Sequence, residues 1–302
     1  MSQRLADTFT RLRSGGEPGL VTYVTAGDPG YARSRDILLA LDRAGADVIE
    51  LGVPFSEPLA DGPVIQRATE RALAGGMTLA KTLDLVEDLR GQVRAPIVLF
   101  TYANPIYRFG IDAFAARARQ AGVDGVLTLD LPIEEAGPLQ TRLAADAIDT
   151  IFLVSPTTTD ERLRRAGELG SGFLYGISRL GVTGIRADVA AGAEALATRM
   201  RKESRLPVAL GFGLSRPEHI RDVVRFADAA VVGIPDERFG EAICALVEPH
   251  AGDTIDEATL IAHVKEHLAG YKAPKRVVAI ESVGRAANGK LDYTALKALA
   301  QL

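Results

Sequence analysis

The stretch RFADAAVVGIPDERFGEA, residues 225–242, decides how this chain is organised. Its apolar run DAAVVG (228–233) fits the last strand of a barrel that begins near the N-terminus, and it fits equally well an early strand of a different C-terminal domain. A short apolar run bounded by turn residues is typical of a buried strand, but it does not identify the sheet that the strand joins. The interpretation therefore depends on the sequence on either side.

Seven further apolar runs rich in Val, Ile and Leu precede this one, and amphipathic stretches such as RDILLALDRAGA and LAKTLDLVEDLR lie between them. The runs are at 19–27, 47–53, 96–103, 125–131, 150–155, 173–178 and 207–213. Near-continuous apolar runs indicate strands that are buried on both faces, as in a parallel sheet. Eight such strands alternating with helices predict an α/β fold of the (β/α)8 TIM-barrel type. A doubly wound open sheet is the alternative, although no GxGxxG follows the first strand.

The sequence after residue 233 does not continue as a simple eighth barrel helix. It contains two strand-like runs, AICALVEP and RVVAIESV, with a predicted helix, DEATLIAHVKEHLAG, between them. We therefore expect a barrel at 1–233 whose last helix region is replaced by a small α+β module at 234–302. A module of this length is short for independent folding.

Composition excludes several classes of protein. The 302 residues carry a formal net charge of −4, which gives no sign of nucleic-acid binding. No apolar run approaches the roughly 20 residues of a membrane helix, and the N-terminus does not resemble a signal peptide. Cys244 is the single cysteine, so no internal disulfide can form, and a cytoplasmic location is the simplest interpretation.

The positions of the histidines limit the chemistry further. All four lie at or after His219, and no His or Cys occurs in residues 1–218. A site in that part of the chain cannot use a Ser-His pair, a Cys nucleophile or a His-ligated zinc. Acid–base chemistry would fall to carboxylates, Tyr or Lys.

Three acidic residues lie near the C-terminal ends of predicted strands, where TIM-barrel enzymes place their active sites. Glu50 lies inside the second strand, Asp61 in the loop that follows it, and Asp130 at the end of the fourth. Two carboxylates reaching one pocket can divide acid and base roles if burial separates their pKa values. The alternatives are a structural ion pair for Glu50, an Asp-Gly turn for Asp61 and a loop-orienting hydrogen bond for Asp130.

Two glycine-rich segments follow late strands. GVTGIR (181–186) follows the sixth and GFGLSRPEHI (211–220) the seventh, where Ser215 could cap a helix that begins at Arg216 or Pro217. Barrel enzymes often bind phosphate with late loops and a helix N-terminus, although turns require glycine in any case. This pattern favours a phosphorylated substrate.

Residues 1–233 resemble the alpha subunit of tryptophan synthase. The matching stretches are VTYVTAGDP, GADVIELGVPFSEPLADGPVIQRA, TYANPI, GVDGVLTLDLP, SPTTTDERL, FLYGISRLGVTG and GFGLSRPEHI. The resemblance implies a carbon–carbon lyase that cleaves indole-3-glycerol phosphate to indole and glyceraldehyde 3-phosphate in tryptophan biosynthesis. It implies that the reaction uses no metal and no organic cofactor. It also implies a tryptophan synthase beta subunit as partner, in an alpha2beta2 assembly.

The same resemblance implies roles for particular residues. Glu50 matches the proton-shuttling acid–base, Asp61 the acid that holds the indole nitrogen, and Tyr175 and Thr183 residues that shape and close the site. The residues expected at the substrate are Tyr23, Phe100, Leu127, Asp130, Leu153 and Phe212, with Gly184, Gly213 and Gly233 toward the phosphate. Each apolar member could instead be ordinary core.

Two departures from the family pattern affect these expectations. Ser56-Glu57-Pro58 stands where the family has Ser-Asp-Pro, in the loop that communicates with the beta subunit. Gly233-Ile234-Pro235 stands where the family has Gly-Ser at the last phosphate-binding turn. Proline has no N–H to donate and isoleucine has no hydroxyl, so we expect a weaker grip on the phosphate.

From about residue 228 to 302 the chain also resembles the C-terminal subdomain of adenylate-forming acyl-CoA synthetases. DAAVVGIPDERFGEAICALVEP, LAGYKAPKRVVAIESV and GRAANGKLDYTALK carry this resemblance, and Lys290 matches the adenylation lysine of that family. The large ATP-binding domain is missing, so Lys290 is otherwise a solvated turn residue. The alternative functions are therefore an inactive fusion, a binding module, or an accessory subdomain of an acyl- or aryl-adenylating enzyme.

Overall fold

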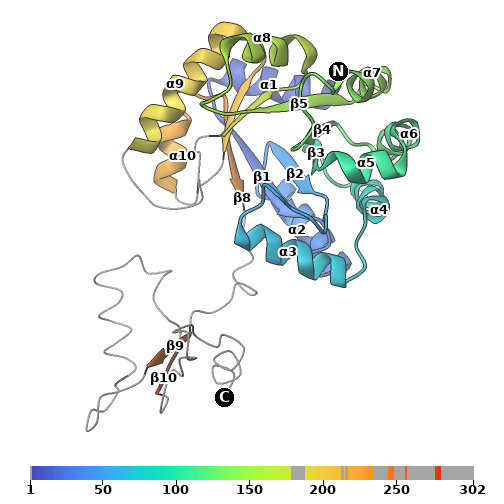
Figure 1. The fold of residues 1–302 in the computed structure, drawn as a ribbon, viewed down its shortest axis with the longest axis vertical. Helices are drawn as coiled ribbons and strands as arrows, with labels where there is room; N and C mark the ends of the chain where they lie inside the picture. The colour runs from blue at the N-terminus through green and yellow to red at the C-terminus, as the bar shows by residue number, and fades with distance from the viewer. Residues whose placement is uncertain are drawn as a thin grey trace, which may run out of the picture. The chain divides into compact units, whose positions relative to one another are not determined.

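The computed structural model describes residues 2–177, 188–211, 214, 217–233, 244–247, 256 and 276–279. Eight parallel strands form a closed barrel in the order β1 to β8, with the helices outside it (Figure 1). The predicted (β/α)8 barrel is therefore confirmed, and the alternative of an open sheet is wrong. By its internal contacts the chain divides into two compact units, Met1–Pro235 and Asp236–Leu302.

The eight predicted strands are all present, with ends that differ by a few residues. They are β1 (Gly19–Thr25), β2 (Val48–Gly52), β3 (Ile97–Thr101), β4 (Gly125–Thr128), β5 (Asp149–Val154), β6 (Leu174–Ile177), β7 (Val208–Gly211) and β8 (Ala229–Gly233). The helices of this unit are α1 (Gln3–Gly15), α2 (Tyr31–Arg43), α3 (Pro63–Ala74), α4 (Leu79–Leu89), α5 (Ala103–Phe109), α6 (Ile111–Ala121), α7 (Gly137–Ala145), α8 (Asp160–Leu169), α9 (Asp188–Glu203) and α10 (Pro217–Val223).

Alternate residues of each strand face the barrel interior, because successive side chains of a strand point to opposite faces. On β2, Val48 and Glu50 have the interior parity, whereas Ile49 and Leu51 pack in the outer cluster with the helices. Both sets are fully buried. This explains why the strands read as continuous apolar runs, and it makes the charged Glu50 an exception within its strand.

Helix α1 is an element that the sequence analysis did not predict. Its buried face consists of Leu5, Phe9 and Leu12, which belong to the interior cluster of the barrel. The Phe9 ring packs against Phe173, just before β6, with ring centres 5.5 Å apart. The spacing 5, 9, 12 and the N-cap at Ser2, whose side chain accepts a hydrogen bond from the Leu5 N–H, are the signals that could have revealed it.

The structure answers the question that residues 225–242 pose. Strand β8 pairs with β1 from Gly19–Ala229 to Tyr23–Gly233, and it pairs with β7 on its other side. The run DAAVVG is therefore the last strand of the barrel. The rival expectation of an unclosed barrel with exposed apolar strands is wrong, since Ala230 and Val231 of β8 are buried.

A repeated carboxylate contact ties the N-terminal ends of the strands together. Asp47, Asp124 and Asp228 each precede an even-numbered strand, and each accepts a hydrogen bond from a backbone N–H of the preceding odd strand at 2.8–2.9 Å. Before β6 the Ser171 hydroxyl has the same place and accepts from Thr150 at 3.1 Å. Asp228, at the start of the ambiguous stretch, thus makes the same contact as its counterparts elsewhere in the barrel.

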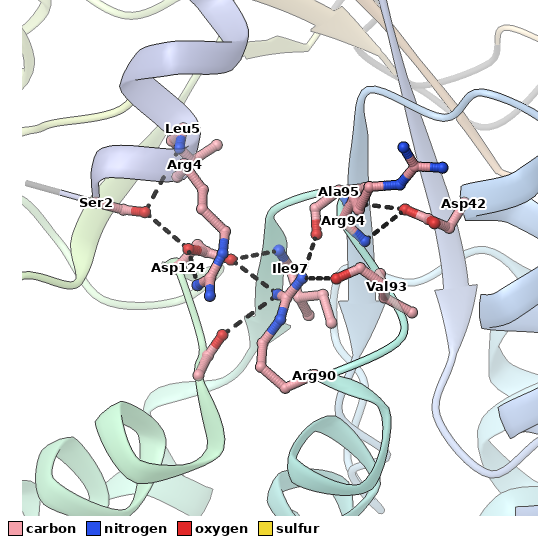
Figure 2. Close-up of polar contacts among 11 residues, drawn as sticks. Ser2, Arg4, Leu5, Asp42, Arg90, Val93, Arg94, Ala95, Ile97 and Asp124 are labelled. Atoms are coloured by element: carbon pink, nitrogen blue, oxygen red, sulfur yellow. Dashed lines mark hydrogen bonds and ion pairs between the residues drawn. The ribbon is translucent and has the colours of Figure 1, made fainter.

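Asp124 is the centre of the largest of these contacts. Figure 2 shows its carboxylate between Ser2 and Arg4 on one side and Arg90 and Ile97 on the other. The Arg90 guanidinium also donates to the carbonyl oxygens of Val93 and Ala95. Asp124 is buried and the Arg90 side chain is only 12% exposed. Each charge has lost most of its solvation, and the attraction between the two compensates for that loss.

We expect Asp124→Ala to destabilise the barrel by about 3 kcal/mol, because it leaves a buried arginine without its carboxylate. Urea denaturation of the variant and the parent chain measures this. Asp112→Ala is the matched control, since the Asp112 carboxylate is 90% exposed in its ion pair with Arg142 and should contribute less than about 0.5 kcal/mol. Equal losses in the two variants would contradict a special role for Asp124.

The second unit is described only in part. Strands β9 (Cys244–Val247) and β10 (Arg276–Ala279) lie within the two predicted strand-like runs and pair in parallel. The helix predicted over 256–270 lies outside the described residues apart from Asp256. Among the helices that the structure describes, none is long and apolar enough to cross a membrane.

Candidate active site

Glu50 is a carboxyl group buried inside the barrel. It lies on β2, it is 0% exposed, and neither carboxylate oxygen has a hydrogen-bond partner among the described residues. Burial raises the pKa of Glu50 from 4.5 to about 8, because the charged form is poorly solvated there. The alternative of a structural ion pair for Glu50 finds no partner in the part of the chain that the structure describes.

Two aromatic residues adjoin Glu50 on neighbouring strands. Tyr23 on β1 is in register with Glu50, and its ring meets Phe100 of β3 edge to face with ring centres 5.3 Å apart. Burial raises the pKa of Tyr23, and the charges of Asp61 and Glu50 raise it further. The Tyr23 hydroxyl therefore stays protonated beside both carboxyl groups.

Tyr175 approaches the same group from β6. It is 3% exposed, and its pKa is raised first by burial and then by the charges of Glu50 and Tyr23. Its hydroxyl occupies the space next to Gly211 on β7, where a Cβ atom would collide with it. The structure thus brings Glu50, Tyr23 and Tyr175 together in the barrel interior, although they lie far apart in sequence.

Asp61 lies in the loop between β2 and α3 and is partly exposed. Burial raises the pKa of its carboxyl group, and a hydrogen bond with the Tyr102 side chain opposes that shift. The Tyr102 oxygen also accepts a hydrogen bond from the backbone N–H of Ala60 at 3.0 Å. On the other side of the loop, the Gln66 amide donates to the Asp61 carbonyl oxygen at 2.8 Å. Several contacts therefore hold the segment that carries this carboxylate.

Tyr102 is the site residue that sequence reasoning missed. It stands in the stretch TYANPI immediately after β3, and it is only 3% exposed. A tyrosine at the C-terminal end of a barrel strand is the signal that could have found it. Burial raises the pKa of Tyr102 to about 12, with a further contribution from the Asp61 charge.

Asp130 has a backbone partner. Its Oδ1 accepts a hydrogen bond from the N–H of Ala103, the first residue of α5, at 2.7 Å. This contact agrees with the loop-orienting alternative for Asp130. A carboxylate at a helix N-terminus also interacts favourably with the helix dipole.

The remaining predicted residues divide into two groups. Leu127 and Leu153 belong to or pack against the interior cluster, and Gly233 pairs with Tyr23 at the end of β8. Among the residues that the structure describes, no atom lies within 4 Å of a Cβ built on Gly233. Thr183, Gly184, Phe212, Gly213 and Lys290 lie outside the described residues, as does Ser215.

We expect Gly52→Ala to disturb this site. A Cβ at Gly52, the last residue of β2, would collide with the Tyr23 hydroxyl and lie 2.7 Å from its Cζ. Displacing the ring should cost about 1–3 kcal/mol of stability and reduce activity at least tenfold. Gly91→Ala is the control, because no described atom lies within 4 Å of the new methyl group. Wild-type activity in Gly52→Ala would show that the Tyr23 position does not matter.

Comparison with known proteins gives this geometry its context. The sequence model described as tryptophan synthase alpha chain matches residues 9–236. A tryptophan synthase alpha chain from Citrifermentans bemidjiense is 49% identical over 230 residues, which cover 76% of this chain and 86% of that protein. This chain belongs to the tryptophan synthase alpha chain family. Members of the family are lyases that cleave indole-3-glycerol phosphate to indole and glyceraldehyde 3-phosphate, and they pair with a beta subunit.

Solved structures agree with this family assignment. The tryptophan synthase alpha subunit of Legionella pneumophila matches with a TM-score of 0.71 and 37% identity, covering 77% of this chain and 86% of that one. Tryptophan synthase of Mycobacterium tuberculosis matches with a TM-score of 0.72 and 37% identity, covering 77% and 89%. The similarity thus spans the barrel of this chain.

The C-terminal part matches a second family model, the AMP-binding enzyme C-terminal domain, at residues 221–290. The two family models overlap across β8. The tryptophan synthase alpha chain of Geotalea uraniireducens is 44% identical over 270 residues, which cover 89% of this chain and 98% of that protein. That alignment continues well beyond Gly233, into the region that the second model also matches.

Proposed function

We propose that this chain cleaves indole-3-glycerol phosphate with Glu50 as the acid–base group and Asp61 as the carboxylate that holds the indole N–H. The observation that carries the proposal is the buried carboxyl group of Glu50, which has no hydrogen-bond partner among the described residues and whose pKa is raised to about 8. A group that titrates near neutral pH can both give and take a proton at a useful rate. The family membership identifies the reaction to which this property belongs.

The reaction needs a proton to move twice. Near pH 7 Glu50 starts protonated and gives its proton to C3 of the indole ring, so that the positive charge develops on the ring nitrogen. The resulting carboxylate then takes the proton of the glycerol hydroxyl next to the ring. The electrons of that O–H bond form the aldehyde carbonyl. The C–C bond breaks, and its electrons go to the indole ring and neutralise the positive charge there. Indole and glyceraldehyde 3-phosphate leave, and Glu50 is protonated again.

Asp61 supplies the negative charge that stabilises the cationic indole ring. Its carboxylate accepts the indole N–H, and this interaction strengthens as the ring becomes cationic, which is the condition for lowering the barrier. In this proposal Tyr175 shapes the interior beside Glu50, and Thr183 has the role that the family resemblance implies, closing the site against water. Tyr23, Phe100, Leu127 and Leu153 are the proposed apolar walls for the indole ring, with Phe212 added by the resemblance alone.

The resemblance to the family implies that backbone N–H groups at Gly184, Gly213 and Gly233 bind the phosphate of the substrate. Pro235 cannot donate an N–H at the last turn, and Ile234 has no hydroxyl. Losing one or two charge-assisted hydrogen bonds costs about 1.5–3 kcal/mol each. Because phosphate lies far from the breaking bond, the loss appears mainly as a raised KM.

The partner is a tryptophan synthase beta subunit, in an alpha2beta2 assembly. Two large apolar residues near Asp61 are exposed, Leu59 at 90% and Val64 at 54%. Exposed apolar side chains grouped beside an active site favour a protein interface. Glu57 in the same loop is one methylene longer than the usual Asp, which weakens coupling between the subunits. A cytoplasmic location stays a prediction.

Indole release from indole-3-glycerol phosphate by the purified chain tests the proposal, with and without a beta subunit. Indole formation that rises when the beta subunit is added is the expected result. A folded chain that releases no indole, even at high substrate concentration and with the beta subunit present, would overturn the lyase proposal. It would favour the alternative of an inactive fusion or binding module.

A further inference from the structure

Tyr102 joins the loop of Asp61 to the end of β3. Its oxygen accepts a hydrogen bond from the N–H of Ala60, the residue before Asp61, at 3.0 Å. The Tyr102 hydroxyl also interacts with the Asp61 side chain and lowers the pKa of that carboxyl group against the effect of burial. One phenol group thus holds the backbone beside Asp61 and favours the charged form of its carboxylate.

The ring of Tyr102 is itself held in place. It is 3% exposed and packs against Phe55, near the start of the same loop, with ring centres 5.1 Å apart. Phe55 and Ala60 therefore contact one tyrosine from two points of the segment that carries Asp61. The loop is tied to the barrel through this side chain.

The segment that follows β4 fixes the backbone around Tyr102. Asp130 accepts the N–H of Ala103 at 2.7 Å, and Leu129 donates its N–H to the Thr101 carbonyl oxygen at 2.9 Å. These contacts set where α5 begins, with Tyr102 as its N-cap residue. A continuous path of contacts therefore runs from Asp130 through Ala103 and Tyr102 to Asp61.

We infer that Tyr102 is a positioning residue of the cleavage reaction, which orients the Asp61 carboxylate, and that Asp130 acts one step behind it by fixing the start of α5. This inference rests on the proposed function of Asp61. The anchored loop holds the Asp61 carboxylate at the end of β3, and its oxygens can accept the indole N–H. The interaction with the Tyr102 hydroxyl favours the ionised form of Asp61, which is the form that can stabilise a cationic ring.

The test is Tyr102→Phe, which keeps the ring on Phe55 and removes only the hydroxyl. We expect kcat to fall about tenfold or more with little change in KM, since the lost interaction matters most in the transition state. The acidic limb of the pH–rate profile should move to higher pH, because Asp61 loses an interaction that favours its charged form. Tyr107→Phe, which removes an exposed hydroxyl from α5, is the control and should match the parent chain.

A second pair of variants tests the path through Asp130. Asp130→Ala should reproduce part of the shift of the acidic limb, whereas Asp130→Asn keeps an oxygen that can accept the Ala103 N–H and should restore the parent profile. If Tyr102→Phe does not fold, this pair of Asp130 variants still tests whether the contacts from Asp130 to Asp61 affect catalysis. A parent-like pH profile and kcat in both Tyr102→Phe and Asp130→Ala would overturn the inference.

A measurement without substrate separates this inference from the proposed function. The Asp61 carboxyl can be titrated by carbon-13 NMR in the parent chain and in Tyr102→Phe, with its signal assigned by its absence in Asp61→Asn. A higher Asp61 pKa in Tyr102→Phe supports the inference even if the parent chain releases no indole. An unchanged Asp61 pKa overturns it even if the parent chain is an active lyase.

Discussion

Glu50→Gln is expected to lower kcat for indole release by about 10²–10⁴-fold while the barrel stays folded. Glutamine has nearly the same shape as protonated glutamic acid, but it can neither give a proton to C3 of the indole ring nor take one from the glycerol hydroxyl. Substrate binding should change little, so KM should stay within a few fold of the parent value. Steady-state assays of indole release, with circular dichroism to verify folding, measure both effects.

Glu70→Gln is the matched control for this variant. Glu70 lies on α3 and is exposed, so the same chemical change there should leave kcat unaltered. If Glu50→Gln retained the parent kcat, Glu50 could not be the acid–base group. Among the described residues of the barrel interior, the remaining candidates would be Tyr23 and Tyr175, whose raised pKa values keep them protonated and make them poor proton donors near neutral pH.

The second large effect concerns stability and pH. The folded chain keeps a proton on Glu50 up to about pH 8, whereas the unfolded chain releases it near pH 4.5. Between these values the folded state binds more protons, so rising pH reduces the free energy of unfolding by about 1.4 kcal/mol per pH unit. From pH 5 to pH 8 this group alone should cost about 3–4 kcal/mol of stability.

Glu50→Gln removes this dependence because glutamine does not titrate. Urea denaturation at pH 5, 6.5 and 8 should therefore show the variant gaining stability relative to the parent chain as pH rises. Above about pH 8 the difference should become constant, since Glu50 is then ionised in both states. Parallel stability curves for the two proteins would show that the folded environment does not hold the Glu50 proton.

The role of Glu50 in catalysis and the loss of stability with rising pH have one cause. The desolvation that suits Glu50 for proton transfer at neutral pH also makes its ionised form unfavourable in the folded chain. The barrel therefore carries a destabilising group at the centre of its interior. We expect variants that relieve this burial to gain stability and lose activity together.

Much of this chain can be predicted from sequence. The period and length of the apolar runs predicted eight buried parallel strands. The absence of His and Cys before His219 favoured carboxylates such as Glu50 and Asp61 as the acid–base groups. These features are local, because a strand buried on both faces needs apolar residues at every position. The matching stretches VTYVTAGDP and GFGLSRPEHI then indicated the family.

Only the tertiary structure decided which sheet DAAVVG joins, because five apolar or small residues fit two different folds. Strand β8 belongs to the barrel since its backbone pairs with β1 and β7, and no local pattern encodes those partners. The same holds for Tyr102 and Asp61, which are 41 positions apart in the chain and meet through one hydroxyl group. Sequence determined the elements and the chemical groups, whereas the closing of the barrel set which groups touch, because those contacts form between distant segments.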